Sequence, residues 1–360
     1  MTVEAGSETR RRAAELSEDG RALEGPLKGY HHETYAFPLP AENRLSARFA
    51  RGKLRDPRPG LFWFDRRCFL SEDRLLIALR GRISRIPECV EVAHNVCLQG
   101  FIEGRTLGSR ARSGRPLSDR HVRQLGQLFE ELAAIKSDEI DIRRICTERY
   151  RSRDGDSADF LLGLIRFTEE EVCRTHADRF GGLFRELGVC DDALKGLKTA
   201  TESLTKRPFT LIHGDLHREN FIVDAAGDLW TIDWELAMIG DPLYDLATHL
   251  HLMHYSRREE ERITEVWRSA VESVRPGSSE GWRQDLPVLL SFKRAQSVYT
   301  DVIRTAVDLG PGPKPNWQLL PRASRRVQLA LKAAAEPLSL SEVPTLRQVM
   351  AAYLGWFRTT

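Results

Sequence analysis

One short block constrains the fold of this chain more than any other segment, the run LIHGDLHREN at residues 211–220. Apolar segments lie on both sides of it, TLI before and FIV after, and LWTI follows a Gly-Asp turn. Segments of this kind predict short buried strands. A polar loop held by a strand at each end keeps its side chains in place, as a reaction centre requires. We therefore expect His213, Asp215 and Asn220 to form part of an active site.

A second carboxylate follows this loop at the end of the next apolar segment. Asp233 lies thirteen residues after Asn220, in the run TIDWE. Two carboxylates and one carboxamide suit Mg²⁺, a hard cation that takes oxygen ligands. The run GDPLYDLA then places Asp241 and Asp245 before or at the start of a helix, where they can accept hydrogen bonds from backbone N–H groups.

These three elements, in this order, resemble the aminoglycoside phosphotransferase and choline kinase family of the protein-kinase-like fold. The shared pattern is His-Gly-Asp-x-x-x-x-Asn, an Asp at a strand end, and Gly-Asp-Pro-x-x-Asp. The resemblance implies a kinase that moves the γ-phosphoryl group of ATP or GTP, with Mg²⁺, onto a hydroxyl. It implies that Asp215 orients the attacking hydroxyl or accepts its proton, beside His213 in the catalytic loop. Asn220 and Asp233 are then the metal ligands.

The rest of the sequence predicts the two lobes of such an α+β fold. Residues 1–25 are charged and poor in aromatic residues, so we expect a flexible N-terminal arm. Residues 26–102 are expected to form a small, β-rich, nucleotide-binding N-lobe. Residues 103–360 are expected to form a larger, mainly helical C-lobe with the catalytic loop and the acceptor-binding helices.

Short extended segments predict the N-lobe strands, at residues 34–38, 61–64 and 96–101. One helix interrupts them over residues 71–79, with Ser71 as its N-cap and leucines at helical spacing.

Two amphipathic helices are predicted early in the C-lobe. The first begins at Ser118, and the second begins at Thr168, where Glu171 completes a capping box. Helices also follow Pro242 and continue to the C-terminus.

The phosphate-binding part of the N-lobe departs from the family pattern. Where the family has a glycine-rich loop, this chain has GYHHETYAF, with one glycine and two histidines. His31 and His32 either donate hydrogen bonds to phosphate oxygens or are surface residues of a strand turn.

The family also implies a strand lysine paired with a glutamate on the following helix. Lys53 and Glu72 fit these positions, since nineteen residues suit a strand, a connection and a first helical turn. Arg51 and Arg55 are the alternative cations in the same basic run.

The strand that ends near Gln99, Phe101 and Ile102 resembles the hinge between the lobes, whose backbone would bind the adenine edge in this family. Read from the residues alone, it is a buried strand followed by a turn.

The composition indicates which cellular environment and which binding partners to expect. The net charge is only +2, from 54 basic and 52 acidic side chains, so no global field favours nucleic acid. The six cysteines include no C-x-x-C pair, and no run of about 18 apolar residues occurs. We therefore expect a soluble, cytoplasmic protein with reduced thiols and no membrane partner.

Three functions remain open at this point. The first is phosphorylation of a hydroxyl on a small-molecule natural product or antibiotic. The second is phosphorylation of Ser or Thr in a ribosomal peptide, with a partner lyase. The third is an inactive nucleotide-binding scaffold, for which the glycine-poor loop is the one supporting feature.

The charge of the C-terminal helices bears on the acceptor. The last 70 residues carry ten lysines and arginines against four aspartates and glutamates. Because like charges in a partly desolvated cleft repel one another, we expect a neutral or acidic acceptor rather than a polycationic aminoglycoside.

Overall fold

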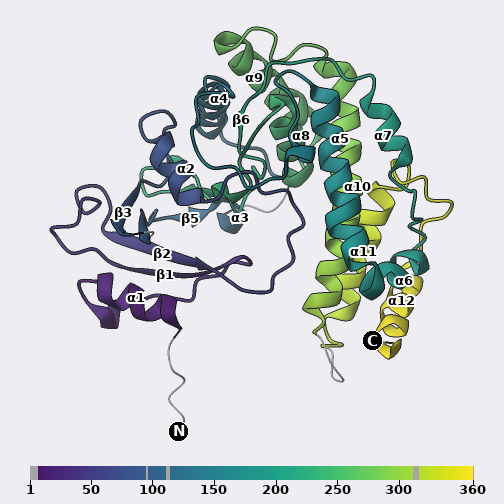
Figure 1. Cartoon of the computed structure of the whole chain (residues 1–360), viewed down its shortest axis with the longest axis horizontal. Coiled ribbons are helices and arrows are strands. Elements are labelled where there is room, and N and C mark those ends of the chain that lie inside the picture. Colours follow the sequence, from purple (N-terminus) through teal and green to yellow (C-terminus); the bar gives the residue numbers. More distant parts are fainter. Residues whose placement is uncertain (1–6, 95, 111–113, 311–315, 360) are drawn as a thin grey trace.

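The structure is a computed structural model of the chain that describes residues 7–94, 96–110, 114–310 and 316–359. Figure 1 shows a small N-terminal sheet with nearby helices and, beside it, a larger and mainly helical part. This is the α+β arrangement that the sequence predicts.

Four antiparallel strands form the N-lobe sheet in the order β1-β2-β4-β3. Strands β1 and β2 pair along their whole length, from His32 opposite Pro57 to Pro38 opposite Arg51. The predicted strands at residues 34–38 and 96–101 correspond to β1 and β4. The four strands are β1 (His32–Pro38), β2 (Arg51–Pro57), β3 (Cys89–Ala93) and β4 (Val96–Gly100).

The predicted strand at residues 61–64 is wrong. Its residues are not in a strand, and β2 ends before them at Pro57. The apolar side chains there belong instead to the core of the C-lobe: Phe64 is buried in it, and Phe62 packs edge-on against Phe180. The apolar residues at 61–64 thus pack against helices, in a segment that follows the last residue of β2 and is not part of the sheet.

Residues 7–25 differ from the flexible arm that the sequence predicts. Helix α1 (Glu8–Leu16) begins at Ser7, whose side chain accepts a hydrogen bond from Arg10 N, and a short turn η1 (Gly20–Ala22) follows. Ala13 is fully buried among the residues of the N-lobe core, and Arg12 pairs with Asp56 of β2 at 3.2 Å. Apolar contacts of Ala13, Leu16 and Leu23, backbone hydrogen bonds to β1 and this ion pair hold a segment whose composition is polar. The first six residues of the predicted arm lie outside the described residues.

Helix α2 (Glu72–Leu79) forms as predicted. Ser71 is its N-cap and accepts a hydrogen bond from Arg74 N at 3.3 Å. Leu75, Leu76 and Leu79 are buried in the large core, which they share with the C-lobe helices. The helix therefore ties the small sheet to the larger part of the molecule.

The first predicted C-lobe helix is confirmed and the start of the second is wrong. Ser118 caps α4, but Thr168 lies where α5 runs on into a π-helical turn, and its hydroxyl donates to Leu164 O at 3.1 Å. That bond to the preceding turn is the alternative to a capping box. The helical elements of the C-lobe are α3 (Leu107–Arg110), α4 (Asp119–Ala133), η2 (Glu148–Tyr150), α5 (Ser157–Phe167), η3 (Thr168–Cys173), η4 (Arg174–His176), α6 (Ala177–Glu186), α7 (Lys195–Thr201), α8 (Pro242–Met253), α9 (Arg257–Val274), α10 (Trp282–Asp308), α11 (Leu320–Ala333) and α12 (Leu346–Thr359).

The central block of short strands forms as predicted. Strands β7 and β8 make a hairpin that β5 extends, and β6 pairs with β9. The polar block at residues 213–220 is the connection from β6 to β7, so buried strands hold both of its ends. These strands are β5 (Arg105–Thr106), β6 (Thr210–Ile212), β7 (Phe221–Val223), β8 (Leu229–Thr231) and β9 (Met238–Gly240).

Across the described ranges, no helix combines the length and the apolar character that crossing a bilayer needs.

Candidate active site

The catalytic loop is anchored from below by Asp245 on α8. The Asp245 carboxylate accepts the backbone N–H groups of His213 and Gly214, each at 2.7 Å. Gly214 has φ of +80°, and a Cβ there would lie 2.7 Å from Leu236 O, so the turn requires glycine. Burial raises the pKa of Asp245 to about 7, and the two N–H donors oppose that rise.

His213 lies beneath the loop rather than in the cleft. Its ring is fully buried, with Nε2 3.1 Å from Ile232 O, and its Nδ1 accepts the Asp215 N–H at 3.3 Å. Burial lowers the pKa of His213 to about 4, so the ring is neutral at pH 7. Its contacts fix the backbone on either side of the reaction centre. The sequence predicts His213 among the catalytic groups, whereas its buried contacts are those of a positioning residue.

Asp215 and Asn220 meet within the loop. Asn220 Nδ2 donates to Asp215 Oδ2 at 3.0 Å and to Asp215 O at 2.9 Å, which leaves the amide oxygen of Asn220 for another partner. His217 Nε2 lies 3.3 Å from Asp215 Oδ2. Burial alone would raise the pKa of Asp215, but the hydrogen bond and charge of His217 hold it below its usual value.

Asp233 reaches the same cleft from the end of β8. It is in the left-handed conformation, with φ of 66°, at the start of the turn η5 (Trp234–Leu236). Its carboxylate Oδ1 lies 3.6 Å from Arg55 Nη1, which links the C-lobe strand end to strand β2 of the N-lobe.

Arg55, rather than Lys53, forms the predicted ion pair with Glu72. Arg55 Nη2 lies 2.5 Å from Glu72 Oε2, and both side chains are buried. Arg51, Lys53 and Arg55 share one face of β2, because strand side chains alternate, so the sequence offered three equivalent cations. The structure corrects our choice by placing Arg55 opposite α2.

The other two cations on this face of β2 have different surroundings. Arg51 pairs with Glu24 and Glu103 at the exposed end of the strand. Lys53 lines the cleft, and burial together with the neighbouring Arg55 lowers its pKa.

His31 and His32 line the cleft and contact Glu235. His31 stacks on Trp63, with ring centroids 4.0 Å apart, and its Nδ1 contacts a carboxylate oxygen of Glu235. His32 Nδ1 lies 3.4 Å from the other carboxylate oxygen of Glu235, and burial lowers the pKa of His32 to about 2. Both histidines line the cleft, and their contact with phosphates stays a prediction.

The three predicted hinge residues have two different surroundings. Phe101 and Ile102 line the cleft. Gln99 is fully buried, and its Nε2 donates to Asp73 Oδ1 at 2.7 Å, so this side chain binds α2.

A buried polar cluster on the C-lobe side of the cleft escaped the sequence analysis. Lys293 Nζ lies 3.2 Å from Tyr244 Oη and 2.8 Å from Gln296 Oε1, and Gln296 Nε2 donates to Asp65 Oδ1 at 2.8 Å. Burial alone would lower the pKa of Lys293, but Tyr244, Asp65 and Asp215 keep it above its usual value. The cluster therefore holds a charged ammonium near the Asp215 carboxylate.

One large cleft lies between these elements, and some of the residues described above line it. Its cavity has a volume of about 1600 Å³ and is lined by residues of both lobes. Asp215, Asn220 and Asp233 all lie on its wall.

The oxygen donors of the cleft fit Mg²⁺ better than a transition metal. No group of three or more His, Cys, Asp or Glu side chains within the described ranges is arranged as a metal site. Mg²⁺ commonly takes one or two protein ligands together with substrate phosphates and water. The Asp233 carboxylate and the amide oxygen of Asn220 are the groups that could form such a pair of ligands.

The comparisons with known proteins agree with this geometry. Residues 24–282 match the model of the phosphotransferase enzyme family. No curated protein sequence matches the chain significantly.

Several solved structures share the fold along nearly the whole chain. A choline/ethanolamine kinase family protein from Mesorhizobium loti is 15% identical with a TM-score of 0.52, over 96% of this chain and 98% of that one. Macrolide 2′-phosphotransferase MphH from Brachybacterium faecium is 16% identical with a TM-score of 0.54, over 92% and 98%. A thermostable mutant of aminoglycoside phosphotransferase APH(4)-Ia, in ternary complex with ADP and hygromycin B, is 15% identical with a TM-score of 0.51, over 93% and 99%.

Such low identities show the fold alone, and they confirm the predicted protein-kinase-like architecture. The family match covers the catalytic loop, Asp233 and Asp245, and it extends over most of the chain. It confirms the predicted enzyme class. The protein belongs to the phosphotransferase enzyme family.

Proposed function

We propose that this enzyme transfers the γ-phosphoryl group of ATP or GTP, with Mg²⁺, onto a hydroxyl of a small-molecule natural product or antibiotic. The observation that carries the proposal is the meeting of Asp215, Asn220 and Asp233 on the wall of one cleft. Phosphoryl transfer needs little covalent chemistry from the protein, so positioning and electrostatics carry most of the catalysis.

Asp215 acts on the acceptor. Its carboxylate orients the attacking hydroxyl and accepts its proton as the bond to phosphorus forms. Asn220 Nδ2 and His217 both contact Oδ2 of this carboxylate, which leaves Oδ1 for the acceptor hydroxyl. The depressed pKa of Asp215 keeps the group ionised at neutral pH.

Asn220 and Asp233 would hold Mg²⁺, which neutralises the charge on the phosphates when bound. The carboxylate of Asp233 faces the cleft from the C-lobe, and Arg55 faces it from β2 at 3.6 Å. The Arg55 guanidinium and the Asp233 carboxylate with its ion therefore orient the phosphates between the two lobes.

The N-lobe supplies further donors to the phosphates. His31 and His32 line the cleft in the region where the family has a glycine-rich loop, and Lys53 lines it from β2. Hydrogen bonds from the histidines and the charge of Lys53 replace part of the backbone cradle that glycines would provide.

The acceptor lies on the side of Lys293 and the helices α10 and α11. Arg304, Arg322 and Arg325 line the cleft there, and within the described ranges none of them forms an ion pair with a carboxylate. Arg326 differs, because it pairs with Asp301 at 3.2 Å. This excess of positive charge supports a neutral or acidic acceptor.

An acceptor panel tests the proposal. The full-length protein is incubated with Mg-ATP or Mg-GTP and with macrolides, aminoglycosides, acidic and neutral hydroxylated natural products, and acidic Ser/Thr peptides. We expect nucleotide-dependent phosphorylation of a neutral or acidic small molecule, seen as a gain of one phosphoryl group by mass spectrometry and lost in Asp215→Asn. Transfer only to the peptides would replace the proposal with the peptide-kinase alternative. Binding of nucleotide without any transfer would indicate a scaffold.

A further inference from the structure

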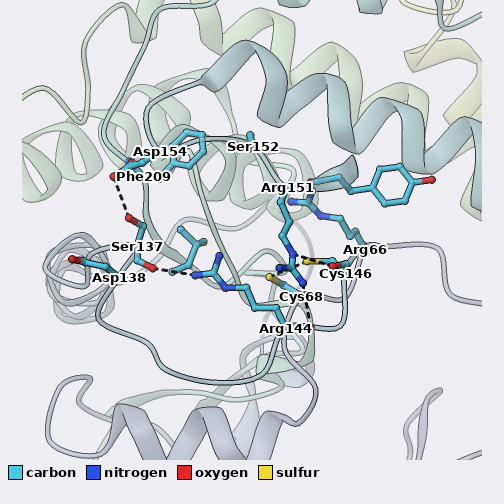
Figure 2. Close-up of a pocket in the computed structure, with 12 residues that line it drawn as sticks. Arg66, Cys68, Ser137, Asp138, Arg144, Cys146, Arg151, Ser152, Asp154 and Phe209 are labelled. Carbon is cyan, nitrogen blue, oxygen red and sulfur yellow. Dashed lines mark hydrogen bonds between the residues drawn. The ribbon is translucent and has the colours of Figure 1, made fainter. Parts of the chain in front are cut away.

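A second cavity lies outside the catalytic cleft and holds two thiols among three arginines (Figure 2). Its volume is about 210 Å³. The segment between β2 and α2 forms one wall, and residues 137–154 form another. The two segments are joined by backbone hydrogen bonds, from Ile145 N to Cys68 O at 2.8 Å and from Leu70 N to Arg143 O at 3.0 Å.

The two thiols are in contact. Cys146 Sγ lies 3.6 Å from Cys68 Sγ, and both residues line the cavity although they are only 8% and 5% exposed. A disulfide has an S–S distance of about 2.05 Å, so the sulfur atoms need to approach by roughly 1.5 Å. The backbone bonds between the two segments already hold the cysteines side by side.

A buried cation beside the thiols has no carboxylate partner. Arg66 is 5% exposed, its guanidinium contacts Tyr150 O and Met238 Sδ, and its Nε atom has no hydrogen-bond partner. In the part of the chain that the structure describes, no carboxylate forms an ion pair with Arg66. Because an uncompensated buried charge is costly, the site favours an anion close to this guanidinium.

The surroundings of the two thiols shift their pKa values in opposite directions. The pKa of Cys146 is lowered to about 5 by the hydrogen bond from Cys68, by the contact with Arg151 and by the charge of Arg66. The same hydrogen bond and burial raise the pKa of Cys68. Cys146 is thus the more acidic thiol of the pair, and Cys68 is the less acidic one.

We propose that Cys146 and Cys68 form a redox-active pair that a hydroperoxide, with hydrogen peroxide as the simplest member, converts into an intramolecular disulfide. The proposal concerns this cavity alone and does not depend on the acceptor of the phosphotransferase.

The reaction proceeds in two balanced steps. The Cys146 thiolate attacks one oxygen of hydrogen peroxide, an S–O bond forms, the O–O bond breaks, and the departing hydroxide takes a proton from solvent. Cys68 then loses its proton to solvent and attacks the Cys146 sulfur. The S–S bond forms, the S–O bond breaks, and the second hydroxide leaves as water after protonation. The two sulfur atoms together lose two electrons, and the peroxide is reduced to two molecules of water.

The remaining cysteines provide internal controls. Cys190 is exposed, so it reports the reactivity of a solvent-accessible thiol. Cys89 and Cys97 lie on the neighbouring strands β3 and β4, and they form a second close pair without the arginine-lined cavity.

The experiment treats the whole protein with hydrogen peroxide under native conditions, then alkylates and digests it without reductant. We expect the intact protein to lose two hydrogens, a cross-linked peptide that contains Cys68 and Cys146, and full reversal by dithiothreitol. Cys89→Ser/Cys97→Ser should retain this cross-link. Cys146→Ser should abolish it, and Cys68→Ser should stop at a sulfenic acid on Cys146 that dimedone traps.

Three results would overturn the proposal. One is peroxide treatment that leaves Cys68 and Cys146 as thiols while Cys190 is oxidised. Another is a cross-link confined to Cys89 and Cys97. The third is dimedone labelling of Cys68 rather than Cys146 in the two single variants, which would reverse the assigned roles. Circular dichroism of each variant shows whether it is folded, and the mapping of the unmodified chain stands without any variant.

Discussion

Arg55 Nη2 lies 2.5 Å from Glu72 Oε2. The ion-pair partner of Glu72 is therefore a guanidinium on strand β2, where the sequence predicts the Lys53 ammonium. A planar guanidinium has five donors and can contact Glu72, Asp233 and Glu235 together, as it does here. Lysine has one compact charge, so the two residues are not interchangeable at this position.

Arg55→Ala should lower both stability and activity more than Lys53→Ala. The change leaves Glu72 buried without its partner, which costs roughly 3–5 kcal/mol for a buried pair. Thermal unfolding with steady-state kinetics measures both effects, and Arg51→Ala at the exposed end of the strand is the matched control, with an expected cost of about 0–1 kcal/mol. A larger loss in Lys53→Ala than in Arg55→Ala would restore the lysine to this role.

Asp215→Asn should reduce transfer at least about a hundredfold with little change in nucleotide affinity, because its carboxylate acts on the acceptor hydroxyl. Single-turnover kinetics and nucleotide titration measure the two quantities separately. Near-normal turnover in this variant is the result that removes Asp215 from the mechanism.

Asp233→Ala should lose the Mg²⁺-dependent part of nucleotide binding, since it removes one of two proposed protein ligands to the ion. Calorimetric titration with and without Mg²⁺ shows the difference. Glu219→Ala is the control, because this exposed residue lines the same cleft without a proposed metal role. Unchanged affinity for the Mg-nucleotide in Asp233→Ala would contradict the assignment.

His217→Asn should move the acidic limb of the kcat/KM profile to higher pH. The hydrogen bond and charge of His217 lower the pKa of Asp215 against the effect of burial, so their loss lets that pKa rise. The base is then protonated at a pH at which the native enzyme is still active. A profile whose acidic limb stays in place would show that His217 does not tune Asp215.

The contact between His217 and Asp215 also predicts how the stability of the protein depends on pH. The pKa of His217 is raised by Asp215 despite burial, so its contribution is fully present below the unfolded pKa of about 6.5 and is lost as pH rises through the folded value. The depressed Asp215 contributes above its unfolded pKa and loses that contribution as pH falls through the folded one. The free energy of unfolding of His217→Asn should therefore differ most from that of the native protein at a pH between the unfolded pKa of Asp215 and the unfolded pKa of His217. Denaturant unfolding at several pH values measures this difference, and a difference that does not depend on pH would contradict the coupling of the two residues.

Lys293→Met should raise the KM of an acidic acceptor while nucleotide affinity changes little. The methionine keeps much of the buried volume but removes the charge that Asp65 and Asp215 stabilise. The KM of that acceptor should also rise with salt in the native enzyme, since salt screens the attraction. Efficient phosphorylation of a polycationic aminoglycoside, strengthened at low salt, would show that the acceptor wall is acidic in effect.

The polar loop between β6 and β7 was predictable because the apolar segments that hold it are local in the sequence. Asp215, Asn220 and Asp233 lie within one run of short strands, and strand ends fix where such residues meet. Which of Arg51, Lys53 and Arg55 pairs with Glu72 could not be predicted, because all three point to one face of β2. Only the position of α2 selects between them. The contact of Gln296 with Asp65 spans 231 positions, so tertiary packing alone creates it. The apolar segment at residues 61–64 misled us because burial against helices and burial within a sheet look alike over four residues.

Glu72 also accepts the backbone N–H of Trp234 at 3.1 Å, so one carboxylate holds both β2 and the segment that follows Asp233. Strand β2 and the segment that follows Asp233 are thereby held together by contacts within the protein itself. The entropic cost of arranging them is met when the protein folds and does not recur at each encounter with a nucleotide.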